Sequence, residues 1–241
     1  IGDRLLNPAY RKFFNLIQFV SFSNNMEYEN GDESQMELVK AGSFYTTPNG
    51  LKTQFSFFRE NYTNYHEEYQ YNTLDEDCCK EIIKDLGYSP SVFDEAEFST
   101  NNSVMSPCNR FITSFFDKKR FLFFLKYGIC HVKASNQNPP EKHTMRYPQF
   151  FASQRLLERL EKGGKRGIIW HCQGSGKTEL AVYLNRILHA YYAKRNIITR
   201  FYFVVDRLEL LRQDNGEFSN RYFQVTNANS KKDFSNELNK T

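Results

Sequence analysis

A glycine-rich segment, Gly167-Ile-Ile-Trp-His-Cys-Gln-Gly-Ser-Gly-Lys-Thr178, carries the residues best suited to chemistry in this 241-residue chain. A short apolar run leads into a glycine turn, and an apolar pattern at helical spacing follows it. Glycines let successive backbone N–H groups point at phosphate oxygens, and the N-terminus of the following helix adds a partial positive charge. Lys177 would reach the terminal phosphates, and the hydroxyl of Thr178 would bind Mg²⁺. We therefore expect a nucleotide site whose contacts come from Gln173, Gly174, Ser175, Gly176, Lys177 and Thr178.

One position departs from the general phosphate-binding loop. His171 stands five residues before Gly176, where many such loops have glycine, although helicase-type motor proteins often lack it. The alternative is a strand–turn–helix corner that reads Gly-Lys-Thr without binding phosphate. Because the apolar run precedes the turn and a helical pattern follows it, we favour the nucleotide site.

Two residues upstream are candidates for reading the base. The segment Met145–Ala152 opens a predicted helix that runs to about Gly163, with Pro148 in its first turn. A glutamine amide offers one donor and one acceptor, which matches the N6 and N7 edge of adenine. We therefore expect Gln149 to contact the adenine, and Arg146 either to pack on the adenine face or to anchor the turn.

A second polar position follows a buried-strand pattern, Arg200–Val205. Asp206 comes directly after it, as the Mg²⁺-organising aspartate does in a Walker B strand. A short helix is predicted next, and aspartate is a favoured N-cap. From these residues alone we favour the N-cap.

The other elements come from periodicity and turn residues. The dense aromatic residues of the N-terminal half are interpreted as a packed core rather than a base-stacking platform, because the surrounding acidic charge would repel phosphates. We expect helices over residues 5–20, 74–86, 111–127 and 178–194, and strands over residues 19–28, 41–46, 53–58, 129–132 and 222–226.

Charge is distributed unevenly, although the net charge is only +4. Residues 21–100 contain 16 acidic and 5 basic residues, whereas residues 141–200 contain 12 basic and 4 acidic residues. A basic region suits nucleotide and nucleic acid, but from charge alone we favour solvated helix faces over nucleic-acid binding. The five cysteines form no C-x-x-C pair and are odd in number, which favours reduced thiols in a cytosol. No apolar run has the length of a membrane span.

Three motifs in this order resemble the start of the motor in type I restriction enzyme R subunits, which are superfamily 2 helicase-like translocases. They are Met145-Arg-Tyr-Pro-Gln-Phe-Phe-Ala152, the loop of residues 167–178, and Phe203-Val-Val-Asp-Arg-Leu-Glu-Leu210. The segment of residues 13–25 resembles the end of the family's nuclease domain, and the helix around residues 109–112 resembles the connection from nuclease to motor. Under this resemblance, Asp206 and Arg207 belong to motif Ia, which follows one DNA strand through its backbone.

The resemblance implies an α/β fold: a RecA-like parallel sheet with its P-loop, incomplete at the C-terminal end, preceded by a mixed α+β region. It implies that residues 1–108 end a nuclease-type domain, that residues 109–144 connect, and that residues 145–241 begin the first ATPase lobe. The expected function is an ATP- and Mg²⁺-dependent translocase and endonuclease that acts on double-stranded DNA in a bacterial or archaeal cytoplasm. Its expected partners are the modification (methyltransferase) and specificity subunits.

Two parts of the family pattern are missing from this sequence. No Asp-Glu-x-His box precedes Thr241, and no Asp…Glu-x-Lys triad stands before residue 20. We therefore expect a middle piece of a larger subunit, inactive by itself. The alternatives are another superfamily 2 motor, of the type III restriction or repair kind, and a non-catalytic nucleotide-binding module.

Overall fold

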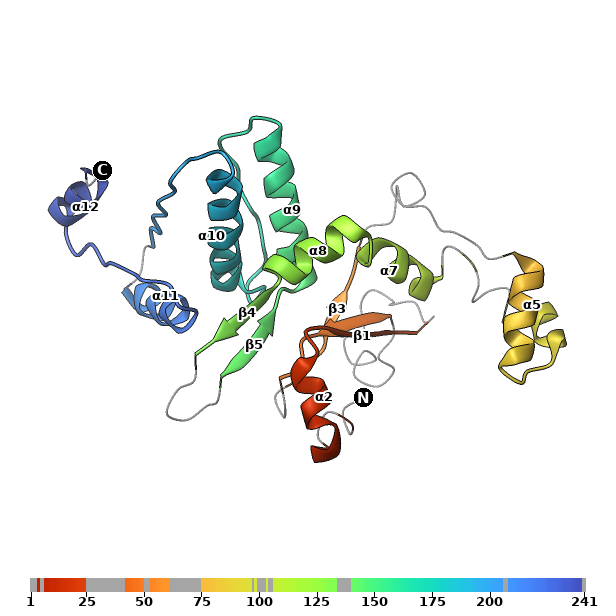
Figure 1. The fold of residues 1–241 in the computed structure, drawn as a ribbon. Coiled ribbons are helices and arrows are strands. Elements are labelled where there is room, and N and C mark those ends of the chain that lie inside the picture. The colour runs from red at the N-terminus through yellow and green to blue at the C-terminus, as the bar shows by residue number, and fades with distance from the viewer. Residues whose placement is uncertain are drawn as a thin grey trace. The chain divides into compact units, whose positions relative to one another are not determined.

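The chain forms two compact units in the computed structural model (Figure 1). The first comprises residues 1–129 and 144–152, and the second comprises residues 130–143 and 153–241. The boundary passes through helix α9 (Tyr147–Glu161). The structure describes residues 4, 7–24, 42–49, 53–60, 75–96, 98, 103, 106–133, 140–205 and 208–239.

The first unit contains a small antiparallel sheet. Its strands are β1 (Val20–Ser23), β2 (Ser43–Thr46) and β3 (Ser56–Phe58), with β2 in the centre. Val20 lies opposite Thr46 in the register of β1 and β2. The three strands expected here are therefore present. Among the described residues each covers fewer positions than the sequence pattern predicts, and residues 25–28 and 41 of the predicted strands lie outside the described residues.

All four residues of strand β2 are buried. Because successive side chains of a strand point to opposite faces of the sheet, both faces of β2 are covered. Phe44 stacks on Phe22, with 4.7 Å between ring centroids, and lies 4.4 Å from the ring of Phe57. Tyr45 points to the other face, where its ring lies 5.5 Å from that of Phe115. The aromatic residues of this region thus form the packed core that the sequence predicts.

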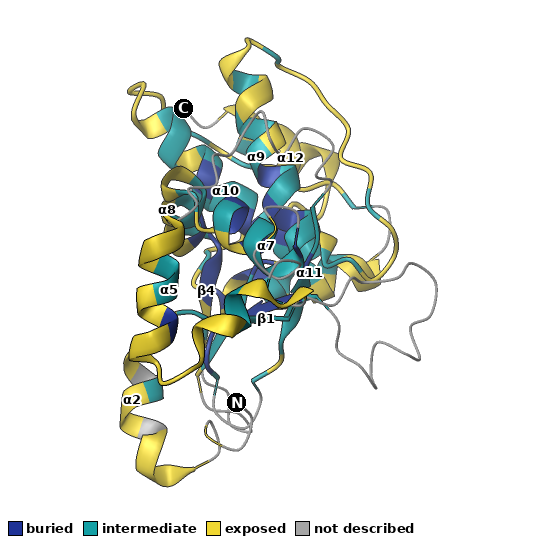
Figure 2. Ribbon diagram, turned by 90° about the vertical axis from the view of Figure 1, so that its right-hand side faces the viewer, coloured by how far each residue is buried: buried dark blue, intermediate teal, exposed yellow. Residues whose placement is uncertain are grey.

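The helices of the first unit differ in burial. Ile83 is the buried residue of α5, whose surface is otherwise mostly exposed (Figure 2).

Residues 17–19 do not continue the first helix, so the helix expected over residues 5–20 is shorter than predicted. The elements are η1 (Pro8–Tyr10), α2 (Arg11–Leu16), α5 (Glu76–Asp85), η3 (Pro90–Asp94), α7 (Pro107–Phe115) and α8 (Lys118–Tyr127).

The single helix expected over residues 111–127 is two helices. Asp117 lies between α7 and α8, and its Oδ1 accepts hydrogen bonds from the backbone N–H groups of Lys119 (3.0 Å) and Arg120 (3.1 Å). These are the orphan donors at a helix N-terminus, so Asp117 is the N-cap that starts α8. Periodicity predicted helical structure over this stretch but could not show the break, because the apolar spacing continues across it, and α7 begins four residues earlier than predicted.

The second unit is mainly helical. Helix α10 buries one face through Leu180, Val182, Tyr183 and Ile187. None of the helices in the described ranges is long and apolar enough to cross a membrane. The unit holds most of the two-stranded sheet of β4 (Ile129–Val132) and β5 (Glu141–Thr144), the second half of α9, and α10 (Lys177–Ala193), α11 (Leu208–Asn220) and α12 (Lys231–Asn239).

Polar contacts attach the end of α11 to the two-stranded sheet. The N–H of Lys133 donates to the carbonyl of Asn220 at 2.8 Å. The buried guanidinium of Arg221 pairs with Glu217 and also contacts Nδ1 of His143 at 3.2 Å. These contacts fix the position of α11 at its C-terminal end.

The parallel sheet expected in this unit does not appear among the described residues. Residues 167–170, 200–205 and 223–226 adopt no regular secondary structure and form no strand ladder. Several of their apolar side chains face solvent: Ile168 is 90% exposed, Trp170 is 91% exposed and Val204 is 86% exposed. A strand is defined by hydrogen bonds to a neighbouring strand, and these segments have none within the described part of the chain.

Candidate nucleotide site

The glycine turn expected to cradle phosphate lies directly before α10. Gly174 and Gly176 adopt left-handed backbone angles, with φ of +76° and +77°. A Cβ at Gly174 would meet no atom within 4 Å, so the backbone conformation, and not crowding, is what favours glycine there. The hydroxyl of Ser175 donates to the carbonyl of Cys172 at 2.8 Å and closes the turn.

Helix α10 begins at Lys177, as the sequence pattern predicts to within one residue. Gly176 is its N-cap, and no side chain caps this end of the helix. A helix of 17 residues that starts behind a glycine turn directs its first N–H groups and its partial positive charge at the turn. This donor set has the chemistry that phosphate oxygens require.

Lys177 folds back over the turn. Its Nζ donates to the carbonyl of Cys172 at 2.9 Å and to the carbonyl of His171 at 3.3 Å. These bonds hold the ammonium above the loop, and the side chain remains exposed. The Nδ1 atom of His171 is buried and has no hydrogen-bond partner among the described residues. Because its two hydrogen bonds hold the Lys177 ammonium above the loop, the positive charge lies at the mouth of the turn. An anion bound there could replace the two carbonyl oxygens as partners of the ammonium.

The hydroxyl of Thr178 has a partner from a distant part of the chain. It donates to Oδ1 of Asp214, on α11, at 3.1 Å. Sequence reasoning missed Asp214, since the only available signal was an aspartate inside a predicted helix. Helices α10 and α11 pack together and bring the two residues into contact.

Two of the other four loop residues expected to contact nucleotide lie at the surface. Gln173 and Gly174 are exposed, whereas Ser175 and Gly176 are half-buried. The structure therefore brings Ser175, Gly176, Lys177 and Thr178 together at the start of α10, with Gln173 and Gly174 forming the outer rim of the turn.

The two candidates for the adenine belong to the first unit, whereas the loop belongs to the second. Gln149 is only 2% exposed, and its Oε1 accepts a hydrogen bond from the backbone N–H of Arg146 at 2.8 Å. This bond links the third residue of α9 to the N–H just before the helix, which is one half of a capping box. Arg146 is exposed at the same turn. The adenine role of both residues stays a prediction.

The two candidates for DNA contact, Asp206 and Arg207, lie outside the described residues. Helix α11 begins just after them, at Leu208, and continues for 13 residues.

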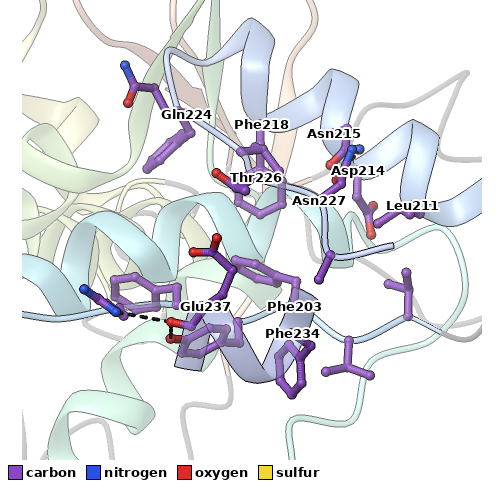
Figure 3. A pocket seen from close by; sticks show the side chains of 18 of the residues that line it. Phe203, Leu211, Asp214, Asn215, Phe218, Gln224, Thr226, Asn227, Phe234 and Glu237 are labelled. Carbon is purple, nitrogen blue, oxygen red and sulfur yellow. Dashed lines mark hydrogen bonds between the residues drawn. The ribbon is translucent and has the colours of Figure 1, made fainter. Parts of the chain in front are cut away.

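A cavity of about 770 Å³ opens beside α11 (Figure 3). Its walls are residues 200–205, α11, residues 223–228 and α12. The ring of Phe203 lies 4.6 Å from that of Phe218, and the ring of Tyr202 lies 5.8 Å from that of Phe234. Figure 3 shows Asp214 at the edge of this cavity, next to Leu211. Asp214 therefore lies between the cavity and Thr178.

Two ionisable groups of the second unit, Cys130 on β4 and Tyr183 on α10, are held neutral by burial. Desolvation raises the pKa of the Cys130 thiol, while the positive charges of Arg221 and Arg186 act in the opposite sense. Desolvation also raises the pKa of Tyr183. Both effects follow from the cost of an unsolvated anion, and neither group faces the glycine turn in a contact that the structure records.

Comparison with known proteins agrees with the motifs. Residues 148–241 match the SWI2/SNF2 ATPase family. The MjaVIIP endonuclease subunit of a type I restriction enzyme from Methanocaldococcus jannaschii is 38% identical over 99 residues, which cover 39% of this chain and 8% of that protein. The MjaVIIIP endonuclease subunit from the same organism is 32% identical over 119 residues, which cover 47% of this chain and 10% of that protein.

The chain therefore spans a small part of the length of the curated relatives that it matches. No solved structure matches it. The two described sheets are not the parallel sheet of a RecA-like fold. That fold is suggested by the match to the ATPase family. On these similarities, the chain resembles the endonuclease subunits of type I restriction enzymes, and its residues 148–241 are similar to SWI2/SNF2 ATPases.

Proposed function

We propose that this chain is the part of a type I restriction R subunit that holds ATP and Mg²⁺, within a protein that translocates along double-stranded DNA and cleaves it. One observation carries the proposal. Lys177 and Thr178 form the first turn of α10, directly behind two left-handed glycines, and lie within the segment that matches the SWI2/SNF2 ATPases. Hydrolysis of bound ATP would supply the free energy for translocation.

Each residue of the turn has a distinct task in this proposal. The ammonium of Lys177 leaves the carbonyls of His171 and Cys172 and pairs with the terminal phosphates. The backbone of Gln173, Gly174, Ser175 and Gly176 surrounds the phosphate oxygens. The hydroxyl of Thr178 binds Mg²⁺, since hard cations take oxygen ligands. Gln149 and Arg146 contact the adenine.

The remaining regions follow from the same proposal. Residues 1–108 end the nuclease-type domain, residues 109–144 connect it to the motor, and residues 145–241 begin the first ATPase lobe. Asp206 and Arg207 belong to the segment that follows the DNA backbone. The whole subunit would work in a prokaryotic cytoplasm with the modification and specificity subunits, and this chain by itself would bind ATP without turning it over.

Thermal unfolding with and without Mg-ATP tests the site. A ligand that binds only the folded protein raises the unfolding midpoint with its concentration. We expect such a rise for the wild type and its loss in Lys177→Ala. The matched control is Lys194→Ala, because Lys194 is exposed just past the other end of α10, roughly 26 Å away at 1.5 Å per residue. An equal rise in Lys177→Ala and the wild type would contradict the phosphate role.

A further inference from the structure

The contact between Thr178 and Asp214 joins the start of α10 to the second turn of α11. The two residues are 36 positions apart, and Asp214 Oδ1 lies 3.1 Å from Thr178 Oγ1. A carboxylate accepts hydrogen bonds and does not donate them, so the hydroxyl proton of Thr178 points at Asp214. Both side chains are half-buried, which protects the bond from competition with water.

The direction of this hydrogen bond determines which way the lone pairs of the Thr178 hydroxyl point. A hydroxyl has one proton and two lone pairs. When the proton is committed to Asp214, the lone pairs face away from α11, and lone pairs on oxygen are what Mg²⁺ binds. The negative charge of Asp214 also favours a cation at the hydroxyl.

We propose that Asp214 is the positioning residue of the nucleotide site, which orients the hydroxyl of Thr178 toward Mg²⁺ and makes ATP binding depend on the metal. This role rests on the proposed function. Asp214 acts through Thr178 and through its charge, and it touches no phosphate.

The alternative role for this contact is a simple link between two packed helices. The two roles predict different effects on ATP affinity when Asp214 is neutralised and Mg²⁺ is absent. A carboxylate near the phosphates repels ATP when no Mg²⁺ is present and assists binding when Mg²⁺ lies between them. Neutralising Asp214 should therefore weaken Mg-ATP binding and leave metal-free ATP binding equal or tighter, whereas loss of a mere structural link would weaken both.

The test measures dissociation constants of the full chain for ATP, once with Mg²⁺ and once with EDTA, by titration calorimetry. We expect Asp214→Asn to reduce the gain in affinity from Mg²⁺ by roughly tenfold, as for one hydrogen bond to a charged group. Thr178→Val should do the same, and Thr178→Ser, which keeps the hydroxyl, should retain the gain. The double variant of Asp214→Asn with Thr178→Val should lose less than the sum of the two single variants, because the two residues act in part as one unit.

Glu209→Gln is the matched control, since Glu209 is an exposed acidic residue on the same helix. The unfolding midpoint of each variant without ligand shows that it is folded. Suppose that Asp214→Asn weakens ATP binding equally with Mg²⁺ and with EDTA, or leaves the gain in affinity from Mg²⁺ unchanged. Either result would overturn the role of Asp214 but not the nucleotide site. A wild type that binds ATP under neither condition would overturn the nucleotide site and this role with it.

Discussion

Gln149 accepts a hydrogen bond from the backbone N–H of Arg146 at 2.8 Å, and thus caps the helix whose third residue it is. The sequence predicts an adenine contact for this glutamine. The structure adds a second task, because a buried amide oxygen that satisfies an N-terminal N–H also holds the start of α9.

The capping role predicts a loss of stability in Gln149→Ala even without nucleotide. Removal of the acceptor takes away the part-buried hydrogen bond of the Arg146 N–H, which costs about 0.5–1.5 kcal/mol. Urea unfolding measures this loss. Gln154→Ala, at a half-buried position later in α9, is the control and should change stability by much less. If Gln149→Ala left stability unchanged but abolished the preference for ATP over GTP, the adenine role would stand alone.

The aromatic core predicts a large effect at Phe115. This side chain is 1% exposed, and the rings of Phe58, Phe124 and Phe19 lie 4.9, 5.2 and 5.3 Å from its own. Phe115→Ala should destabilise the first unit by about 3–5 kcal/mol, because the packed rings cannot collapse fully into the cavity.

The control for this prediction is Leu122→Ala, since Leu122 is 55% exposed. It should cost less than about 1 kcal/mol, as most exposed substitutions do. Denaturant unfolding followed by tyrosine fluorescence compares the two variants. Similar midpoints for both would show that the ring cluster contributes little to stability.

Cys130 predicts a pH dependence of stability in the alkaline range. Its folded-state pKa is raised above the ordinary value of 9.0 by desolvation. The unfolded chain therefore releases the thiol proton first as pH rises past 9.0, while the folded chain retains it. The favourable contribution of the neutral thiol is complete below this pH and is lost as pH rises toward the folded pKa.

Unfolding free energies measured from pH 7 to pH 11 should consequently fall less steeply in Cys130→Ala than in the wild type. Cys78→Ala, at an exposed thiol, should follow the wild-type slope. Tyr183, whose pKa is raised by burial and also by the charge of Cys130, is present in all three proteins, so its burial effect is shared and only its coupling to Cys130 differs. Parallel slopes for Cys130→Ala and the wild type would contradict the burial effect.

The local features of the site could be predicted from the sequence. A glycine turn followed by a helical pattern predicted the start of α10, and Pro148 with its apolar neighbours predicted α9. These predictions succeeded because backbone preferences and 3.6-residue periodicity act over a few residues. The break at Asp117 was within reach of the same rules, since aspartate is a favoured N-cap, but the continuous apolar spacing concealed it.

The tertiary structure alone decided which side chains meet. Residues 200–205 have the composition of a buried strand, yet in the described chain they form no strand ladder, because strand formation depends on a partner that composition does not specify. Thr178 was recognisable from its motif, whereas Asp214 became its partner only through the packing of α11 on α10. The sequence by itself thus determined the turn and its helix, and the packing of distant segments determined what the first hydroxyl of that helix contacts.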